Sequence, residues 1–402
     1  MLLSEFASQG AMHDSSARQP FPKCHPQTRL NVVDFFFHWI TTPTTSKSVY
    51  WLYAPFGHGK SAVMQTLIDR LMTENFQHLV AGAFFFARGK PECNKVIYLL
   101  PTIAYQIAIN IPGMREHITK AIQTDPKLLS RSMDVQLRSL IKDPLFRCVD
   151  GAHFKYPPTV FIDGLDECTS IEEQLSVLDL IIVVLQEFHI PLRFLVASRP
   201  EAHIRDRFAQ PHFVDILEQI RLPDDQGEMI VCLKSKFDDI CDRRARLMKV
   251  SNIQKPWPSE KEIKQLVVRS CGQYIFLDTI TRFVDTERRD PAAQLKTVLY
   301  CLADSSLFSN MDTLYSLILE EAPHPHILKV VIDDLLYRRT HSVFSIPAIA
   351  EIWQFSKTDI QIVLDSLSAV VKEWEGRDLT FLSYVVSRVF GKRSSIWQIL
   401  LY

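Results

Sequence analysis

The residues best suited to chemistry lie in a short glycine-rich run, Ala54-Pro-Phe-Gly-His-Gly-Lys-Ser61. An apolar run of strand-forming residues, 48–53, precedes it, and residues 61–72 follow with the apolar spacing of a helix. In such a strand, turn and helix, the N–H groups of the turn and the positive end of the helix converge on phosphate groups. The run therefore predicts a phosphate-binding P-loop.

Each position in this run suits a separate task. Gly57 and Gly59 let the backbone approach a phosphate closely, Lys60 reaches the β- and γ-phosphates, and the Ser61 hydroxyl ligates Mg²⁺. Ala54 stands where the pattern has its first glycine, and it adds only a methyl group there. A glycine-rich surface turn is the alternative interpretation. The nucleotide-binding residues expected here are Ala54, Gly57, His58, Gly59, Lys60, Ser61 and Ala62.

A second candidate is an apolar run that ends in acidic residues, Pro158-Thr-Val-Phe-Ile-Asp-Gly-Leu-Asp-Glu-Cys168. It has the character of a Walker B strand. Asp163, at the end of the strand, is expected to hold the Mg²⁺ water shell, and Asp166 or Glu167 to orient or deprotonate an attacking water. Alternatively, these carboxylates cap the helix that begins near Ser170.

A third apolar run, Leu192–Ala197, leads into Ser198 and Arg199. Ligands of an open α/β sheet bind at the carboxyl ends of its strands, so Arg199 is a candidate sensor of the γ-phosphate. The alternative is an exposed arginine that pairs with Glu201.

The elements that must position these residues are five strands. They are expected at 48–53, Leu79–Phe86, 158–163, Leu192–Ala197 and Phe213–Leu222, and they alternate with helical segments. This alternation predicts one α/β domain over residues 46–222.

The order of these pieces resembles the NACHT-type P-loop NTPases of fungal NLR-like proteins, which share a nephrocystin-3-like N-terminal domain. The matching pieces span residues 12–320 and are Cys24-His-Pro-Gln-Thr-Arg29, WLYAPFGHGKSA, GAFFFARG, LLPTIAYQIA, VFIDGLDEC, PLRFLVASRPEAHI, Trp257-Pro-Ser259 and Ser270-Cys-Gly-Gln-Tyr-Ile-Phe276. The resemblance implies an AAA-like parallel five-stranded sheet with helices on both faces, in which the strand before Arg199 separates the P-loop strand from the Walker B strand. It also implies that Thr28 and Arg29 lie near the adenine and ribose, although Arg29 could equally be a solvated cap of the helix that follows.

The resemblance also implies how the chain is divided. We expect an amino-terminal linker and first helix (1–45), the nucleotide-binding domain (46–222), a helical lid (223–310), a winged-helix-like subdomain (311–390) and a tail (391–402). Family members usually carry a winged-helix histidine that contacts ADP in the resting state. Ser383 stands roughly in its place, which predicts fast ADP exchange.

Composition excludes several classes of protein. The 402 residues are 47% hydrophobic and 23% charged, as in an ordinary folded chain of two or three domains. The net charge of −1 lacks the basic excess of a nucleic-acid-binding protein, so we expect no nucleic acid. No run is long and apolar enough for a membrane span, and the first residues do not form a secretory signal. The eight cysteines show no secreted-type framework, so a cytoplasmic location with reduced thiols is expected.

Two functions remain open at this point. The first is a switch that binds ATP or ADP with Mg²⁺, hydrolyses ATP slowly, and associates with itself or with related NLR-like proteins according to its nucleotide state. The second is a nucleotide-dependent scaffold or decoy without useful hydrolysis. ATP is favoured over GTP because no [NT]-K-x-D guanine-reading sequence follows the sheet. A small-molecule kinase is disfavoured because it would leave the long helical carboxyl-terminal part unexplained.

Overall fold

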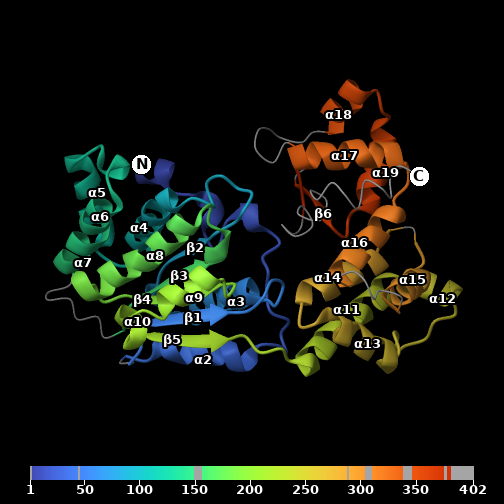
Figure 1. Ribbon diagram of the computed structural model, residues 1–402, viewed down its shortest axis with the longest axis horizontal. Helices are drawn as coiled ribbons and strands as arrows, with labels where there is room; N and C mark the ends of the chain where they lie inside the picture. The colour runs from blue at the N-terminus through green and yellow to red at the C-terminus, as the bar shows by residue number, and fades with distance from the viewer. Residues whose placement is uncertain are drawn as a thin grey trace. The chain divides into compact units, whose positions relative to one another are not determined.

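A computed structural model describes residues 2–43, 46–148, 156–287, 289–303, 310–337, 346–374 and 378–381 (Figure 1). The chain divides into two compact units, 1–223 and 224–402. The hydrophobic clusters of the first unit share no residue with the cluster of the second. Each unit therefore has a core of its own.

The first unit is built on a parallel sheet in the order β2-β3-β4-β1-β5. The strands are β1 (Val49–Tyr53), β2 (Val80–Phe85), β3 (Thr159–Asp163), β4 (Arg193–Ser198) and β5 (Leu217–Arg221). Residues of β2, β3 and β4 are buried throughout, as strands covered on both faces must be. Since β4 separates β1 from β3, the expected fold class and its strand order are confirmed.

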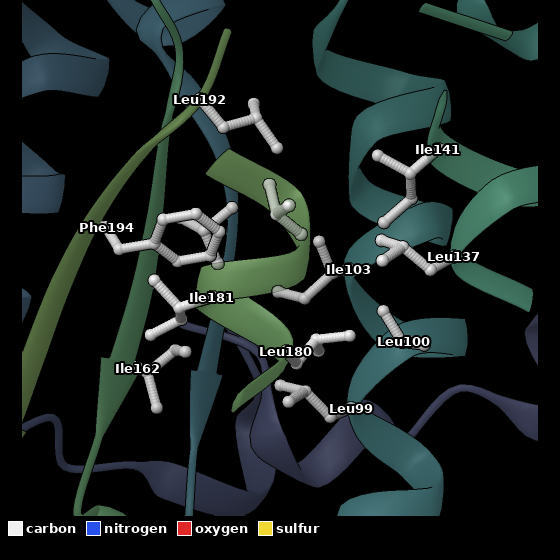
Figure 2. A pocket seen from close by; sticks show the side chains of 12 residues that line it. Leu99, Leu100, Ile103, Leu137, Ile141, Ile162, Leu180, Ile181, Leu192 and Phe194 are labelled. Carbon is white, nitrogen blue, oxygen red and sulfur yellow. The ribbon is translucent and has the colours of Figure 1, made fainter. Parts of the chain in front are cut away.

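Helices cover both faces of this sheet. One face packs against α2 (Leu30–Thr41) and α3 (Lys60–Thr73), and the other against α4 (Leu99–Asn110) and α8 (Ile171–Ile182). The second face encloses a small apolar cavity, into which side chains from α4, α8 and β4 point (Figure 2). Every group lining it is hydrophobic, so the cavity belongs to the core.

Shorter helices complete the first unit. They are α1 (Leu2–Phe6), α5 (Met114–Thr124), α6 (Met133–Leu137), α7 (Asp143–Cys148), α9 (Ala202–Phe208) and α10 (Pro211–Val214), with π-helical turns at 138–142 and 183–187. The sequence prediction of one strand over Phe213–Leu222 was too long. Pro211 at the first position of α10 favours a helical turn there, and the strand begins only at Leu217.

The backbone of edge strand β2 is bonded to amide side chains of α4. Ala83 N donates a hydrogen bond to Gln106 Oε1 at 2.9 Å, and Gln106 Nε2 donates to Ala83 O at 2.8 Å. Asn110 Nδ2 donates to Val80 O at 3.0 Å. These side chains satisfy the backbone groups that an edge strand leaves without a neighbouring strand.

One buried arginine closes the carboxyl end of α2. Arg193, at the start of β4, is 2% exposed, and its guanidinium donates four hydrogen bonds to backbone carbonyls. The acceptors are the carbonyl oxygens of Trp39, Ile40, Thr42 and Pro43, at 2.7–3.2 Å. The last carbonyls of a helix have no partner within it, so Arg193 supplies one for this end.

The described part of the second unit is helical and ends in a two-stranded hairpin. Its helices are α11 (Gln226–Arg243), α12 (Ala245–Val250), α13 (Glu260–Ser270), α14 (Tyr274–Val284), α15 (Pro291–Ala303), α16 (Asn310–Glu320), α17 (Pro325–Tyr337), α18 (Ile346–Trp353) and α19 (Lys357–Ser366). The antiparallel strands β6 (Val371–Trp374) and β7 (Asp378–Phe381) follow three helices, as in a winged helix. Ser383 lies outside the described residues. None of the helices in the described part combines the length and apolar character that crossing a membrane would require.

Candidate functional site

The glycine-rich run forms the turn between β1 and α3. Gly57 and Gly59 have φ angles of 78° and 93°, the left-handed region that favours glycine. A Cβ at Gly59 would meet no atom within 4 Å, so the requirement for glycine there is conformational. Ala54 is buried and does not have a positive φ, so the methyl group that replaces the usual first glycine causes no backbone strain.

Lys60 folds back onto this turn. Its ammonium donates to Ala54 O at 2.8 Å and to Pro55 O at 3.0 Å. Burial lowers the pKa of Lys60, and the nearby carboxylates Asp166 and Asp163 act against this shift. Among the residues that the structure describes, no side chain caps the amino end of α3. The first N–H groups of the helix, which have no partner within it, lie at the same turn as the Lys60 ammonium.

Asp163 ends β3 on the face of the sheet that packs against α3. Its side chain is buried, and burial raises its pKa to about 6, opposed by a hydrogen bond from Ser61 and by the charges of Arg18 and Lys60. Within the described part of the chain, nothing donates a hydrogen bond to its Oδ1 atom. A buried carboxylate oxygen without a donor is an acceptor that a cation would satisfy.

The donor set fits Mg²⁺ better than a metal held by protein alone. Among the described residues, no three His, Cys, Asp or Glu side chains gather where they could hold a metal ion. Mg²⁺ usually keeps several waters and takes one or two protein oxygens together with substrate phosphates. Ser61 and Asp163 match that requirement.

Asp166 is committed to Arg199. Asp166 Oδ1 accepts a hydrogen bond from Arg199 N at 2.9 Å, and Oδ2 lies 3.0 Å from Arg199 Nε. The guanidinium also lies over the ring of Phe56 in the P-loop, at 5.0 Å, while its buried Nη2 has no acceptor among the described residues. The alternative from the sequence, an exposed Arg199 paired with Glu201, is wrong, because Arg199 pairs with Asp166.

Glu167 lies beside this pair with a different environment. Its Oε2 accepts a hydrogen bond from Arg88 N at 3.1 Å, and Arg88 Nη2 donates to Asp166 O at 2.7 Å. Burial raises the pKa of Glu167 to about 7, and the charges of Asp166 and Asp163 add to the rise. A carboxyl group with a pKa near neutrality suits proton transfer.

Arg29 contacts the P-loop, whereas Thr28 bonds locally. Arg29 Nη2 donates to His58 O at 3.1 Å, and Nη1 donates to Pro223 O at the end of the first unit. The Thr28 hydroxyl donates to His25 O at 3.0 Å. Arg29 is 3% exposed, so it is a buried link between segments and not a solvated helix cap.

The family model described as Nephrocystin 3, N-terminal, matches residues 33–199, which hold the P-loop, both acidic positions and Arg199. The P-loop, the acidic end of β3 and the order of the strands occur together in this matched region. The fold is that of a P-loop NTPase.

No curated protein matches the sequence. Solved structures that are similar include Orc1 of Aeropyrum pernix in complex with DNA (13% identity, 94% of this chain and 95% of that chain, TM-score 0.40). Others are Cdc6p of Pyrobaculum aerophilum (12%, 97% and 100%, TM-score 0.37) and RuvB of Thermotoga maritima (12%, 91% and 95%, TM-score 0.33). Identities and TM-scores this low establish no function for this chain, and the expectation of no nucleic-acid partner stays a prediction.

Three residues of the P-loop NTPase fold were missed by sequence reasoning. Arg88 holds the acidic segment after β3, and Trp51 Nε1 donates to Ser198 Oγ at 2.8 Å, next to Arg199. Arg18, between α1 and α2, is the third. Arg88 lies shortly after the carboxyl end of β2, which is a usable signal. Nothing in the spacing of Trp51 or Arg18 points to their partners.

Proposed function

We propose that the first unit binds ATP or ADP with Mg²⁺ and serves as the nucleotide site of a NACHT-type signalling switch. The observation that supports this most strongly is the meeting of three strand ends. Lys60 follows β1, Asp163 ends β3 and Arg199 follows β4, and Asp166 and Phe56 join them through Arg199. Ligands of open α/β sheets bind at this edge.

In this proposal the phosphates lie on the turn before α3. The N–H groups of Gly59, Lys60, Ser61 and Ala62 hold them, and the Lys60 ammonium exchanges its two loop carbonyls for phosphate oxygens. Ser61 and Asp163 hold Mg²⁺, which when bound neutralises charge on the β- and γ-phosphates. Arg29 and Thr28 border the site on the side of His58.

The two acids are assigned separate tasks. The sequence left Asp166 and Glu167 as alternatives for the residue that orients or deprotonates water. Because both oxygens of Asp166 bind Arg199, we assign Asp166 to positioning and Glu167 to the water. The Nη2 atom of Arg199, which has no acceptor among the described residues, then remains for the γ-phosphate.

The remaining functional assignments are part of the same proposal. Residues 223–310 serve as a helical lid and 311–390 as a winged-helix-like subdomain, and the nucleotide state controls self-association or association with related NLR-like proteins in the cytoplasm. The alternative is a scaffold or decoy without useful hydrolysis. One observation supports it: both oxygens of Asp166 are bonded to Arg199, so only Glu167 remains as an acid for catalysis.

The binding claim is tested with two matched lysine variants. Lys60 and Lys47 each donate to two backbone carbonyls, Lys60 in the P-loop and Lys47 at Val214 and Asp215. Lys60→Ala should abolish binding of a fluorescent ATP analogue, because the phosphates lose their cation, while Lys47→Ala should bind it as the wild type does. Equal affinity in all three proteins would refute the P-loop assignment.

Phosphate release and bound nucleotide separate the switch from the scaffold. Slow, Mg²⁺-dependent release that Glu167→Gln removes supports the switch, whereas binding without release supports the scaffold. The replacement of the family histidine by Ser383 predicts fast ADP exchange. Purified protein should therefore carry little ADP, and a monomer that holds stoichiometric ADP would contradict that part of the proposal.

A further inference from the structure

Residues 12–24 run along α3, and we call them the amino-terminal strap. Arg18 Nη1 donates to Gln65 Oε1 at 2.8 Å, in the second turn of α3. Farther along the helix, Lys23 Nζ lies 2.6 Å from Asp69 Oδ2, and Cys24 N donates to Thr66 Oγ1 at 3.0 Å. The strap lies outside the region that the family model matches.

Arg18 is held in one position within this strap. Besides Gln65, its Nη1 bonds to the carbonyls of His13 and Met12 at 2.9 and 3.3 Å. The centre of its guanidinium lies 3.4 Å from the centroid of the Phe85 ring. A cation anchored by three acceptors and an aromatic face is ordered more tightly than a surface arginine.

Its position is next to both proposed Mg²⁺ residues. Phe85, under the guanidinium, is the register partner of Asp163 across β2 and β3. Gln65 lies four residues after Ser61 on α3, one helical turn away on the same face. Burial lowers the pKa of Arg18 to about 10, and the Asp163 carboxylate is the largest influence acting against that shift.

We propose that the amino-terminal strap is a working part of the phosphate site, in which Arg18 supplies an additional fixed positive charge that favours a nucleoside triphosphate over a diphosphate. The inference rests on the proposed function and deepens it. Mg²⁺ held by Ser61 and Asp163 would offset charge on the terminal phosphates, so a cation beside Asp163 would lie at the γ end of the nucleotide. Its attraction for the extra charge of the triphosphate is strengthened by burial.

The test measures the affinities of Mg·ATP and Mg·ADP for Arg18→Met in the full chain. Methionine keeps an unbranched apolar stem over Phe85 but removes the charge. ATP affinity should fall about ten-fold and ADP affinity no more than about three-fold, because attraction between charges a few ångströms apart inside a protein is worth that much. Arg18→Lys should keep most of the preference.

Arg70→Met is the matched control. Arg70 also belongs to the contacts of α3 and lies over a phenylalanine ring, Phe37 at 4.0 Å, but it pairs with Asp34 and Glu74 away from the P-loop. The Arg70→Met variant should bind Mg·ATP and Mg·ADP with the affinities of the wild type. An equal loss of ATP and ADP affinity in Arg18→Met would overturn the inference, since it would mean that Arg18 only holds the strap in place.

A measurement on the wild type covers the case in which the Arg18 variants fail to fold. In hydrogen exchange, Mg·ATP should protect the strap more than Mg·ADP does, because the triphosphate adds a partner for Arg18. Equal protection by the two nucleotides would also overturn the inference. A wild type that binds neither nucleotide would instead refute the proposed function itself.

Discussion

Asp166 and Glu167 are neighbours in the sequence, yet their surroundings give them different chemistry. Asp166 accepts a hydrogen bond from the backbone N–H of Arg199 on one oxygen and pairs with the Arg199 guanidinium on the other. Glu167 receives one backbone hydrogen bond, and burial raises its pKa to about 7. One acid is therefore fixed in an ion pair while the other can exchange a proton near neutral pH.

Glu167→Gln should flatten the pH dependence of stability. The pKa of Glu167 rises from an ordinary 4.5 to about 7 on folding. Between these values the folded state binds more protons than the unfolded state, so the free energy of unfolding should fall as pH rises through this window and level off above about 7. Denaturant titrations of the nucleotide-free protein at several pH values would measure this. The fall should be smaller in the variant, in which the raised pKa of Asp163 still contributes. An identical pH profile would contradict the raised pKa of Glu167.

Asp166→Asn should destabilise the first unit by about 3 kcal/mol, because it leaves the largely buried Arg199 guanidinium without its counter-charge. Thermal unfolding followed by calorimetry would detect the loss. Asp206→Asn, at an exposed position on α9, is the control and should change little. A stable Asp166→Asn variant that still binds ATP but releases no phosphate would show that Asp166, and not Glu167, orients or deprotonates the attacking water.

At this scale the sequence predicted residues within one motif better than contacts between motifs. Lys60 and Ser61 follow from a single strand, turn and helix. The pairing of Asp166 with Arg199 joins the ends of β3 and β4, which are adjacent only after the sheet has formed. Arg18 escaped notice because the strap reaches Phe85 through contacts that no local spacing encodes.

At the scale of elements, Arg193 shows how one strand residue stabilises a helix. Arg193→Met should lower the free energy of unfolding by roughly 3 kcal/mol, since it leaves buried carbonyls at the end of α2 without donors. Urea titration monitored by circular dichroism would measure the change. Arg131→Met, which removes an exposed pair with Asp125, should cost far less. Equal losses would show that the carbonyls find other donors.

The limits of β5 illustrate why some elements were harder to predict. The four apolar strands, β1 to β4, were found from continuous apolar runs. In β5 the residues between Leu217 and Arg221 are partly exposed, so its sequence gives no such run. The apolar run from which the strand was predicted began at Phe213. In the structure Phe213 belongs to the helix α10 and not to the strand.

At the scale of the whole molecule, the two units have separate cores. All the proposed site residues belong to the first unit, 1–223. Calorimetry should therefore show two transitions, and Mg·ATP at about a hundred times its dissociation constant should stabilise the first unit by about 2.7 kcal/mol. Lys60→Ala should keep both transitions but lose this shift. A single transition that ATP moves as a whole would show that the units unfold together.

The amide side chains of Gln106 and Asn110 on β2 have a consequence for how copies of this protein can meet. A bare edge strand invites a strand from another molecule to extend the sheet, which is a common start of aggregation. Here the N–H and C=O groups of Ala83 are already taken within the chain. A strand from another copy that added to β2 at Ala83 would first have to displace Gln106, so this edge of the sheet disfavours pairing between copies and directs regulated assembly to other surfaces.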